Sequence, residues 1–149
     1  MFDELKYIEL SGKKYPIKCD LLVVEKIQDK YENINDFENG LLTWEPILDD
    51  DGNPVYETKE DGSQRIKVRG KFPKVKQVND ALFWFACEGE AIAAELEKRR
   101  PVKIERDNII RSVDISLVRL ANQLYDEFFR CFNLKNVKTT QETETTQEI

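Results

Sequence analysis

The sequence predicts an α+β protein with an N-terminal β-hairpin and short helices, a central protruding β-hairpin, and two long C-terminal helices packed together. Two observations predict this class. Short apolar segments joined by turn residues fill much of the chain before residue 70, and apolar residues at helical spacing fill residues 75–133. The length of 149 residues suits one domain with its own core. We assign residues 1–134 to a single α+β domain.

The N-terminal hairpin is predicted from residues 5–18, where two short apolar runs flank Ser11 and Gly12. A Ser-Gly pair between such runs is typical of a tight turn. Pro16 has no N–H to give to a strand ladder, so the second strand is expected at an edge.

Two short helices are expected to follow the hairpin. Asp20 and Asn33 precede apolar residues at helical spacing, and both residue types are favoured helix N-caps. Gly40 suits the end of the second helix.

The segment 43–70 has a different composition, with turn signals at Asp51–Pro54 and Asp61–Gly62. Residues 55–58 and 65–68 are expected to pair as a β-hairpin around the second turn. Because their faces look polar, we expect a protruding, mobile arm rather than a core element.

An apolar stripe at spacings of three and four runs through residues 75–100 and ends before Pro101. Gly89 lies in this stripe, where it either marks a kink or allows another helix to approach; we favour close packing against the helix of residues 117–132. A short helical piece is expected at 109–113, with Asp114 as the cap of the longer helix. The apolar surface of that helix is wide enough to need partners on two sides, within the domain or in another subunit.

The C-terminal residues 135–149 are rich in threonine, glutamate and glutamine, with few apolar residues. This composition predicts a disordered polar tail.

Charge and hydropathy exclude several classes of partner. The net charge of −6 disfavours nucleic acid and anionic membranes as main partners. No apolar run is long enough to cross a bilayer, and Met1–Lys6 lacks a signal-peptide core, so we expect a cytoplasmic protein. The three separated cysteines indicate reduced thiols, and Cys87 and Cys131 lie in apolar helical patterns.

The sequence lacks the usual residues of catalysis. It contains no histidine and no phosphate-binding glycine loop, and its cysteines do not form a metal-ligand pattern. Asp49–Asp51 before Gly52 do not fit a calcium loop. We therefore expect no enzyme activity, cofactor or metal. The alternative is a carboxylate-dependent enzyme, for which Glu88 and Glu90 are the candidate pair.

Aromatic residues on the long helices are the candidate partner-binding residues: Trp84, Phe83, Tyr125, Phe129 and Phe132. Aromatic side chains are enriched at binding hot spots. Core packing on two sides of the helix is the alternative role for Phe83 and Trp84, which adjoin Phe85.

Two stretches carry a resemblance to a known family. Residues 6–37 include KYIELSGKKYPIKCD and NINDF, and residues 107–132 include DNIIR and EFFRCF. In this order, around a turn-rich middle, they resemble the tail assembly chaperones of long-tailed phages and prophages in Gram-positive bacteria, over about residues 5–133.

The resemblance implies a non-enzymatic protein that binds the tape measure protein and the tail tube protein in the host cytoplasm, and that self-associates as a homo-oligomer. It also implies that a ribosomal frameshift often yields a longer form. The alternative within the same setting is a structural tail component or adaptor retained in the virion.

Overall fold

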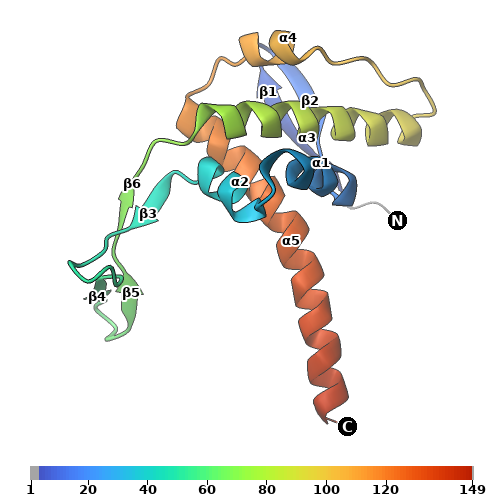
Figure 1. Ribbon diagram of the computed structural model, residues 1–149. Helices are drawn as coiled ribbons and strands as arrows, with labels where there is room; N and C mark the ends of the chain where they lie inside the picture. The colour runs from blue at the N-terminus through green and yellow to red at the C-terminus, as the bar shows by residue number, and fades with distance from the viewer. Residues whose placement is uncertain (1–3, 149) are drawn as a thin grey trace.

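The computed structural model describes residues 4–148, with side chains described as far as Asn133 (Figure 1). It confirms the α+β class. The elements, in chain order, are β1 (Lys6–Leu10), β2 (Lys13–Ile17), α1 (Leu21–Tyr31), α2 (Ile34–Leu41), β3 (Trp44–Pro46), β4 (Tyr56–Thr58), β5 (Gln64–Ile66), β6 (Val68–Gly70), α3 (Val75–Leu96), α4 (Arg106–Arg111) and α5 (Leu117–Glu148).

β1 and β2 form the predicted antiparallel hairpin, with Ile8 opposite Tyr15. Its two-residue turn has positive φ at both Ser11 (51°) and Gly12 (78°), which is the turn geometry that matches the twist of the strands. The inward side chains of the hairpin, including Ile8, are buried in the core.

β2 lies directly against the backbone of α3, and Gly89 allows this approach. A Cβ atom at residue 89 would come within 2.1 Å of the Pro16 carbonyl oxygen and 2.6 Å of the Ile17 nitrogen. One turn earlier in α3, the Phe85 carbonyl accepts a hydrogen bond of 2.9 Å from the Lys18 N–H. Close packing at Gly89 is therefore correct, but the neighbour is β2 and not α5. The edge expected at Pro16 exists, and α3 covers it.

The caps of the first two helices are as predicted. The Asp20 carboxylate accepts from the N–H groups of Leu22 and Val23, and the Asn33 side chain accepts from Asn35 N–H. Asp114 does not cap α5; the Ser116 hydroxyl does, accepting from Arg119 N–H at 3.1 Å.

Gly40 lies in the last turn of α2, as predicted, although Leu42 and not Gly40 is the cap. A Cβ at this position would come within 2.5 Å of the Gln77 side chain on α3, so this glycine too permits a close helix contact.

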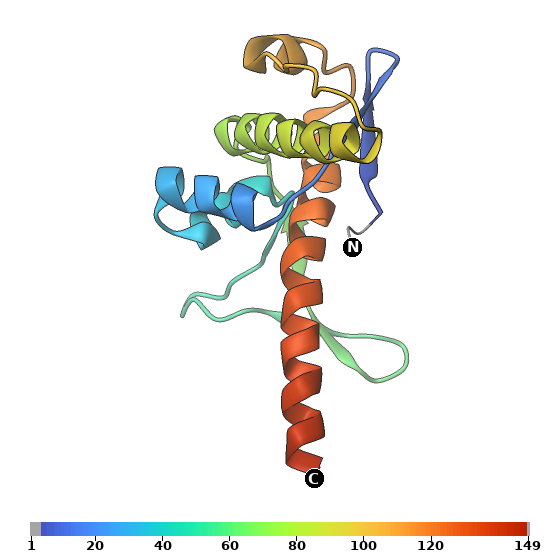
Figure 2. The ribbon, with the colours of Figure 1, turned by 90° about the vertical axis from the view of Figure 1, so that its right-hand side faces the viewer.

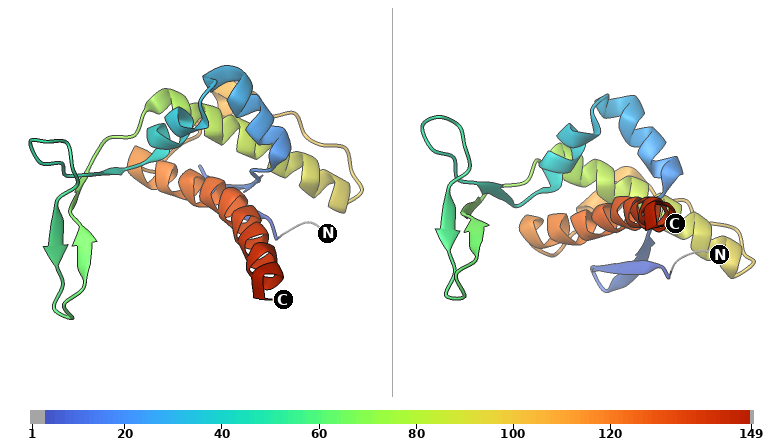
Figure 3. Two further views of the ribbon diagram at one scale, coloured as in Figure 1. Left: turned by 60° about the horizontal axis from the view of Figure 1, so that its bottom comes forward. Right: turned by 90° about the horizontal axis from the view of Figure 1, so that it is seen from below.

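The segment 44–70 projects from the rest of the molecule as a two-legged ribbon, which we call the arm (Figures 1 and 3). One leg is the run of β5 and β6, and the other leg is formed by β3 and β4, separated by a loop at residues 47–55. Lys67 bonds through both its N–H and its C=O to the second leg, at 2.8 Å and 2.9 Å. The arm protrudes as predicted; its mobility stays a prediction.

The core lies where α1, α2, the hairpin and α5 pack around α3, and Figure 2 shows α3 crossing α5. The most deeply buried side chains of α3 and α5 include Val78, Leu82, Phe85, Leu120 and Leu124. The arm contributes no residue to this cluster within the described part of the chain.

The last turns of α5 run to Glu148, but the side chains of residues 134–148 lie outside the described residues, as does Ile149. The disordered tail predicted at 135–149 falls there and stays a prediction, as does the domain boundary at 134.

Gly89→Ala is expected to destabilise the fold by about 3 kcal/mol, because the new methyl group meets strand backbone that cannot rotate away. At an exposed helical site the same change would stabilise by about 1 kcal/mol, so the two effects have opposite signs. Gly40→Ala is the matched comparison, since its methyl meets the Gln77 side chain, and should cost less. Urea denaturation measures all three proteins; a Gly89→Ala variant as stable as the parent would contradict the close contact.

Candidate protein-binding surface

Asp80 on α3 is a buried carboxylate that holds three elements together. Its side chain is 2% exposed and accepts from Arg106 of α4 at 2.7 Å, with Lys30 of α1 at 2.8 Å. The Tyr31 hydroxyl donates a third bond. Because each oxygen is paired, the buried charge joins α1 and α4 to α3.

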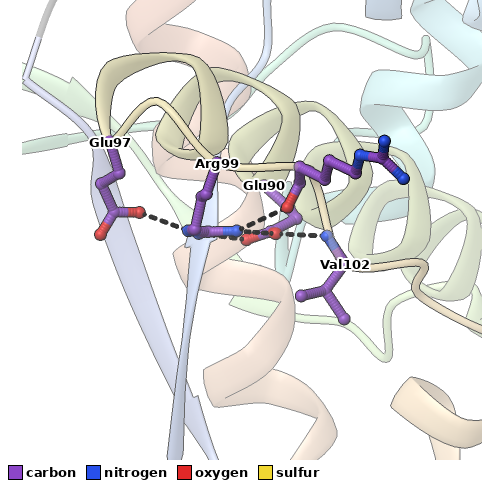
Figure 4. A network of polar contacts seen from close by, with 5 residues as sticks. Glu90, Glu97, Arg99 and Val102 are labelled. Carbon is purple, nitrogen blue, oxygen red and sulfur yellow. Dashed lines mark hydrogen bonds and ion pairs between the residues drawn. The ribbon is translucent and has the colours of Figure 1, made fainter.

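Glu90 holds the chain that follows α3 (Figure 4). It accepts two bonds from the Arg99 guanidinium, at 2.6 Å and 3.0 Å, and one of 2.7 Å from Val102 N–H. The Arg99 bonds, with that of Val102, hold the pKa of Glu90 below its ordinary value despite burial. This carboxylate therefore fixes the turn at residues 97–102.

Glu127 on α5 is a third buried carboxylate, and it ties α5 to the segment that follows the N-terminal hairpin. Its side chain is 1% exposed and pairs with Arg130 at 2.6 Å, and it accepts a bond of 2.8 Å from Cys19 N–H. The Cys19 thiol lies against Cys131 in the core, which confirms the core position predicted for Cys131. Cys87 is only half-buried.

Glu88 and Glu90, the candidate carboxylate pair, contact different partners. Glu88 faces Asp20, the N-cap of α1, with Lys26 and Lys18 nearby, whereas Glu90 is bound to Arg99. The two carboxylates do not converge on a common site, so the structure offers no support for them as an acid–base pair.

Burial, followed by the hydrogen bond and charge of Asp20, raises the pKa of Glu88 from 4.5 to about 7, with Lys26 and Lys18 opposing. Since this folded-state pKa lies above the unfolded value, the protonated form of Glu88 favours folding. That contribution is complete below the unfolded pKa of 4.5 and is lost as the pH rises through about 7.

Glu88→Gln is therefore expected to match the parent's free energy of unfolding at pH ~4 and to exceed it at pH ~8 by about 1 kcal/mol, after allowance for solvent screening. Glu25→Gln, at an exposed position on α1, is the charge-matched control and should show no such pH dependence. Equal gains for both variants at both pH values would contradict the prediction.

Of the predicted partner-binding aromatics, Trp84 and Phe132 are half-buried in one aromatic cluster. The rings follow one another in a chain. The centroid of Trp84 lies 6.2 Å from that of Phe37 on α2, the centroids of Phe37 and Phe128 are 5.7 Å apart, and those of Phe128 and Phe132 are 4.9 Å apart. Phe83 is also half-buried against the core. These three side chains have a packing role, and whether they contact a partner stays a prediction.

Tyr125 and Phe129 form a separate stacked pair on α5, with ring centroids 5.9 Å apart. Phe129 is 51% exposed, and it is the most open of the five predicted residues. The structure thus links Trp84 and Phe132 through one set of ring contacts and Tyr125 and Phe129 through another, while Phe83 packs against the core.

The arm carries an apolar face that the sequence analysis missed. Directly paired residues share a face of a ribbon, so Tyr56 lies beside Ile66 in one half of the arm, and Pro46 lies beside Val68 on the face of Trp44 in the other half. From the alternation of residues along 64–70 we infer that these two groups continue one another across Lys67, which bonds to both Ile47 and Val55. We call this set the apolar face: Trp44, Pro46, Tyr56, Ile66 and Val68. The four largest of these side chains are all exposed: Trp44 by 46%, Tyr56 by 54%, Ile66 by 41% and Val68 by 51%. The expectation of polar faces was wrong for this side.

The opposite face of the arm carries mostly charged side chains, together with the half-buried Ile47 and Val55 that lie opposite Lys67. It bears the ion pairs of Glu57 with Arg65 and of Glu45 with Arg69. The ribbon is therefore amphipathic. Its signal in the sequence is the alternation of apolar and charged residues in 64–70, which indicates two unlike faces once the register is known.

A groove of about 320 Å³ lies between the hairpin and α5, lined by residues such as Lys6, Tyr7 and Gln123. The Gln123 side-chain oxygen there is buried without a hydrogen-bond donor among the described residues. The groove can accept a small hydrogen-bond donor such as water, while its buried acid, Glu127, is already paired.

Within the described residues, no group of three or more potential ligand side chains is placed to hold a metal ion, and no helix has the length and hydropathy to span a membrane. Comparison with known proteins gives no match to a family model, a curated protein or a solved structure. The surface itself therefore carries the argument about function.

Replacing the arm, residues 44–70, by two glycines is expected to leave the melting temperature within about 2 °C of the parent, since the arm adds nothing to the core cluster. The ends can be joined because Lys71 N–H bonds to the Thr43 carbonyl at 3.0 Å. Thermal unfolding followed by circular dichroism measures this, and loss of the cooperative transition would show that the arm supports the fold.

Proposed function

We propose that this protein is a phage tail assembly chaperone that binds the tape measure protein and the tail tube protein in the host cytoplasm, without enzymatic activity and as a homo-oligomer. The observation that carries the proposal is the exposed apolar face of the arm, on a fold whose buried carboxylates Asp80, Glu90 and Glu127 are engaged in structure. Exposed apolar surface of this kind is typical of protein-binding sites.

Charge supports the same function. A protein that binds apolar segments must itself stay dispersed, and the net charge of −6 opposes aggregation. The arm stands clear of the core, so a partner can reach it without opening the fold (Figure 3). Many copies bound along one long partner would gain avidity from individually weak contacts.

The family resemblance implies that the partner is a long, apolar, helical protein. In the proposed function the chaperone covers apolar side chains of the tape measure protein until the tube protein polymerises around it. Phe129, stacked on the half-buried Tyr125, adds a second exposed contact on α5.

Co-expression with the very long protein encoded downstream of a tail tube gene in the same cluster tests this proposal. The chaperone is expected to raise the soluble fraction of that protein about tenfold and to co-purify with it. The Phe85→Asp variant, which places a charge at a fully buried site, is the unfolded control. A partner that stays insoluble and does not co-purify with the parent would refute the proposal.

A structural tail component retained in the virion is a second candidate, favoured by the strand edges that the arm presents to solvent. Mass spectrometry of purified virions distinguishes the two functions. A chaperone is absent from finished particles, whereas a tail component is present in stoichiometric amounts.

A further inference from the structure

The apolar face of the arm is bordered by two acidic loops. The loop at residues 47–55 holds Asp49–Asp51, and the turn between β4 and β5 holds Glu60 and Asp61, all at exposed positions. Hydrogen bonds from Ser63 lower the pKa of Asp61, so this carboxylate is ionised at neutral pH. A binding segment would therefore meet apolar side chains in the centre and negative charge at the margins.

The remaining charges of the arm do not cancel this pattern. The four charges of its opposite face are joined in pairs, Glu57 with Arg65 and Glu45 with Arg69. Lys59 and Lys67 offset only part of the charge of the five loop carboxylates. The arm thus has a negative margin, as the whole chain has a negative net charge.

This charge decides between two occupants of the apolar face. A second copy of the chain would bring acidic loops toward acidic loops, and like charges at an interface oppose binding. A segment with basic side chains would gain attraction at both margins and a faster association.

We propose that the apolar face of the arm binds a polypeptide segment of a partner protein that has apolar side chains on one side and lysine or arginine at its borders. Trp44 and Tyr56 are the anchors, because large aromatic side chains supply most of the binding energy at such sites. The inference deepens the proposed function, on which it rests for the partner being a protein, and it adds the surface and the charge of the segment bound.

Binding of a fluorescently labelled amphipathic helix made of leucine and lysine, followed by anisotropy, tests the inference. A peptide of the same pattern made of leucine and glutamate is the control for charge. Ile66→Thr combined with Val68→Thr removes apolar surface and retains strand-favouring side chains. Glu57→Gln combined with Arg65→Gln is the matched control, because it alters the opposite face without changing net charge.

The leucine–lysine peptide is expected to bind the parent and the matched control equally, and to bind the threonine variant and the arm-less protein about tenfold more weakly. Asp50→Asn with Asp51→Asn should weaken binding at low salt but not at high salt. The inference is overturned if the threonine variant and the arm-less protein bind like the parent, if the glutamate peptide binds as tightly, or if neither peptide binds. Melting temperatures of all variants show that the core is intact.

The peptide-binding test and the co-expression test can fail independently of each other. A soluble tape measure protein together with failed peptide binding would retain the proposed function and move its contact to another surface, such as Phe129. Peptide binding at the arm without any effect on the tape measure protein would retain the inference and remove that partner.

Discussion

The contact between the β2 backbone and α3 at Gly89 is the constraint on which the rest of the fold depends. A strand can lie this close to a helix only where the helix has no side chain, and the Cβ distance of 2.1 Å to the Pro16 carbonyl leaves no room for one. The contact places Lys18 N–H on the Phe85 carbonyl and sets the chain entering α1. From there Cys19 reaches Glu127 of α5, so one close approach positions both long helices around the hairpin.

The local elements of this fold were predictable from the sequence, whereas their neighbours were not. The hairpin turn at Ser11 and Gly12 and the cap at Asp20 depend on residues adjacent in the chain, and local conformational preference is enough to indicate them. The neighbour of Gly89 lies some seventy residues away in sequence, and glycine signals a close approach without saying what approaches. The cap at Ser116 was missed because Asp114 is an equally good residue two positions earlier.

The candidate surface shows the same division. The aromatic residues of α3 and α5 were chosen as candidates because aromatic side chains are common in binding sites. Residue type does not show that Trp84 is half-buried and Phe129 exposed, because this difference depends on how other helices, such as α2, pack against Trp84. The apolar face of the arm was missed because each strand has only three residues and carries too few apolar residues to form a pattern alone. The pairing of two strands is what gathers Tyr56 with Ile66.

In this protein the core fixes the fold and the arm is proposed to meet the partner, and hydrogen–deuterium exchange tests that division most directly. Exchange should be compared for the protein alone and in complex with the co-purified tape measure protein. We expect slow exchange in β2 and α3 in both states, and arm amides that exchange fast in the protein alone and slowly in the complex. Arm amides with the same fast exchange in both states would contradict this expectation.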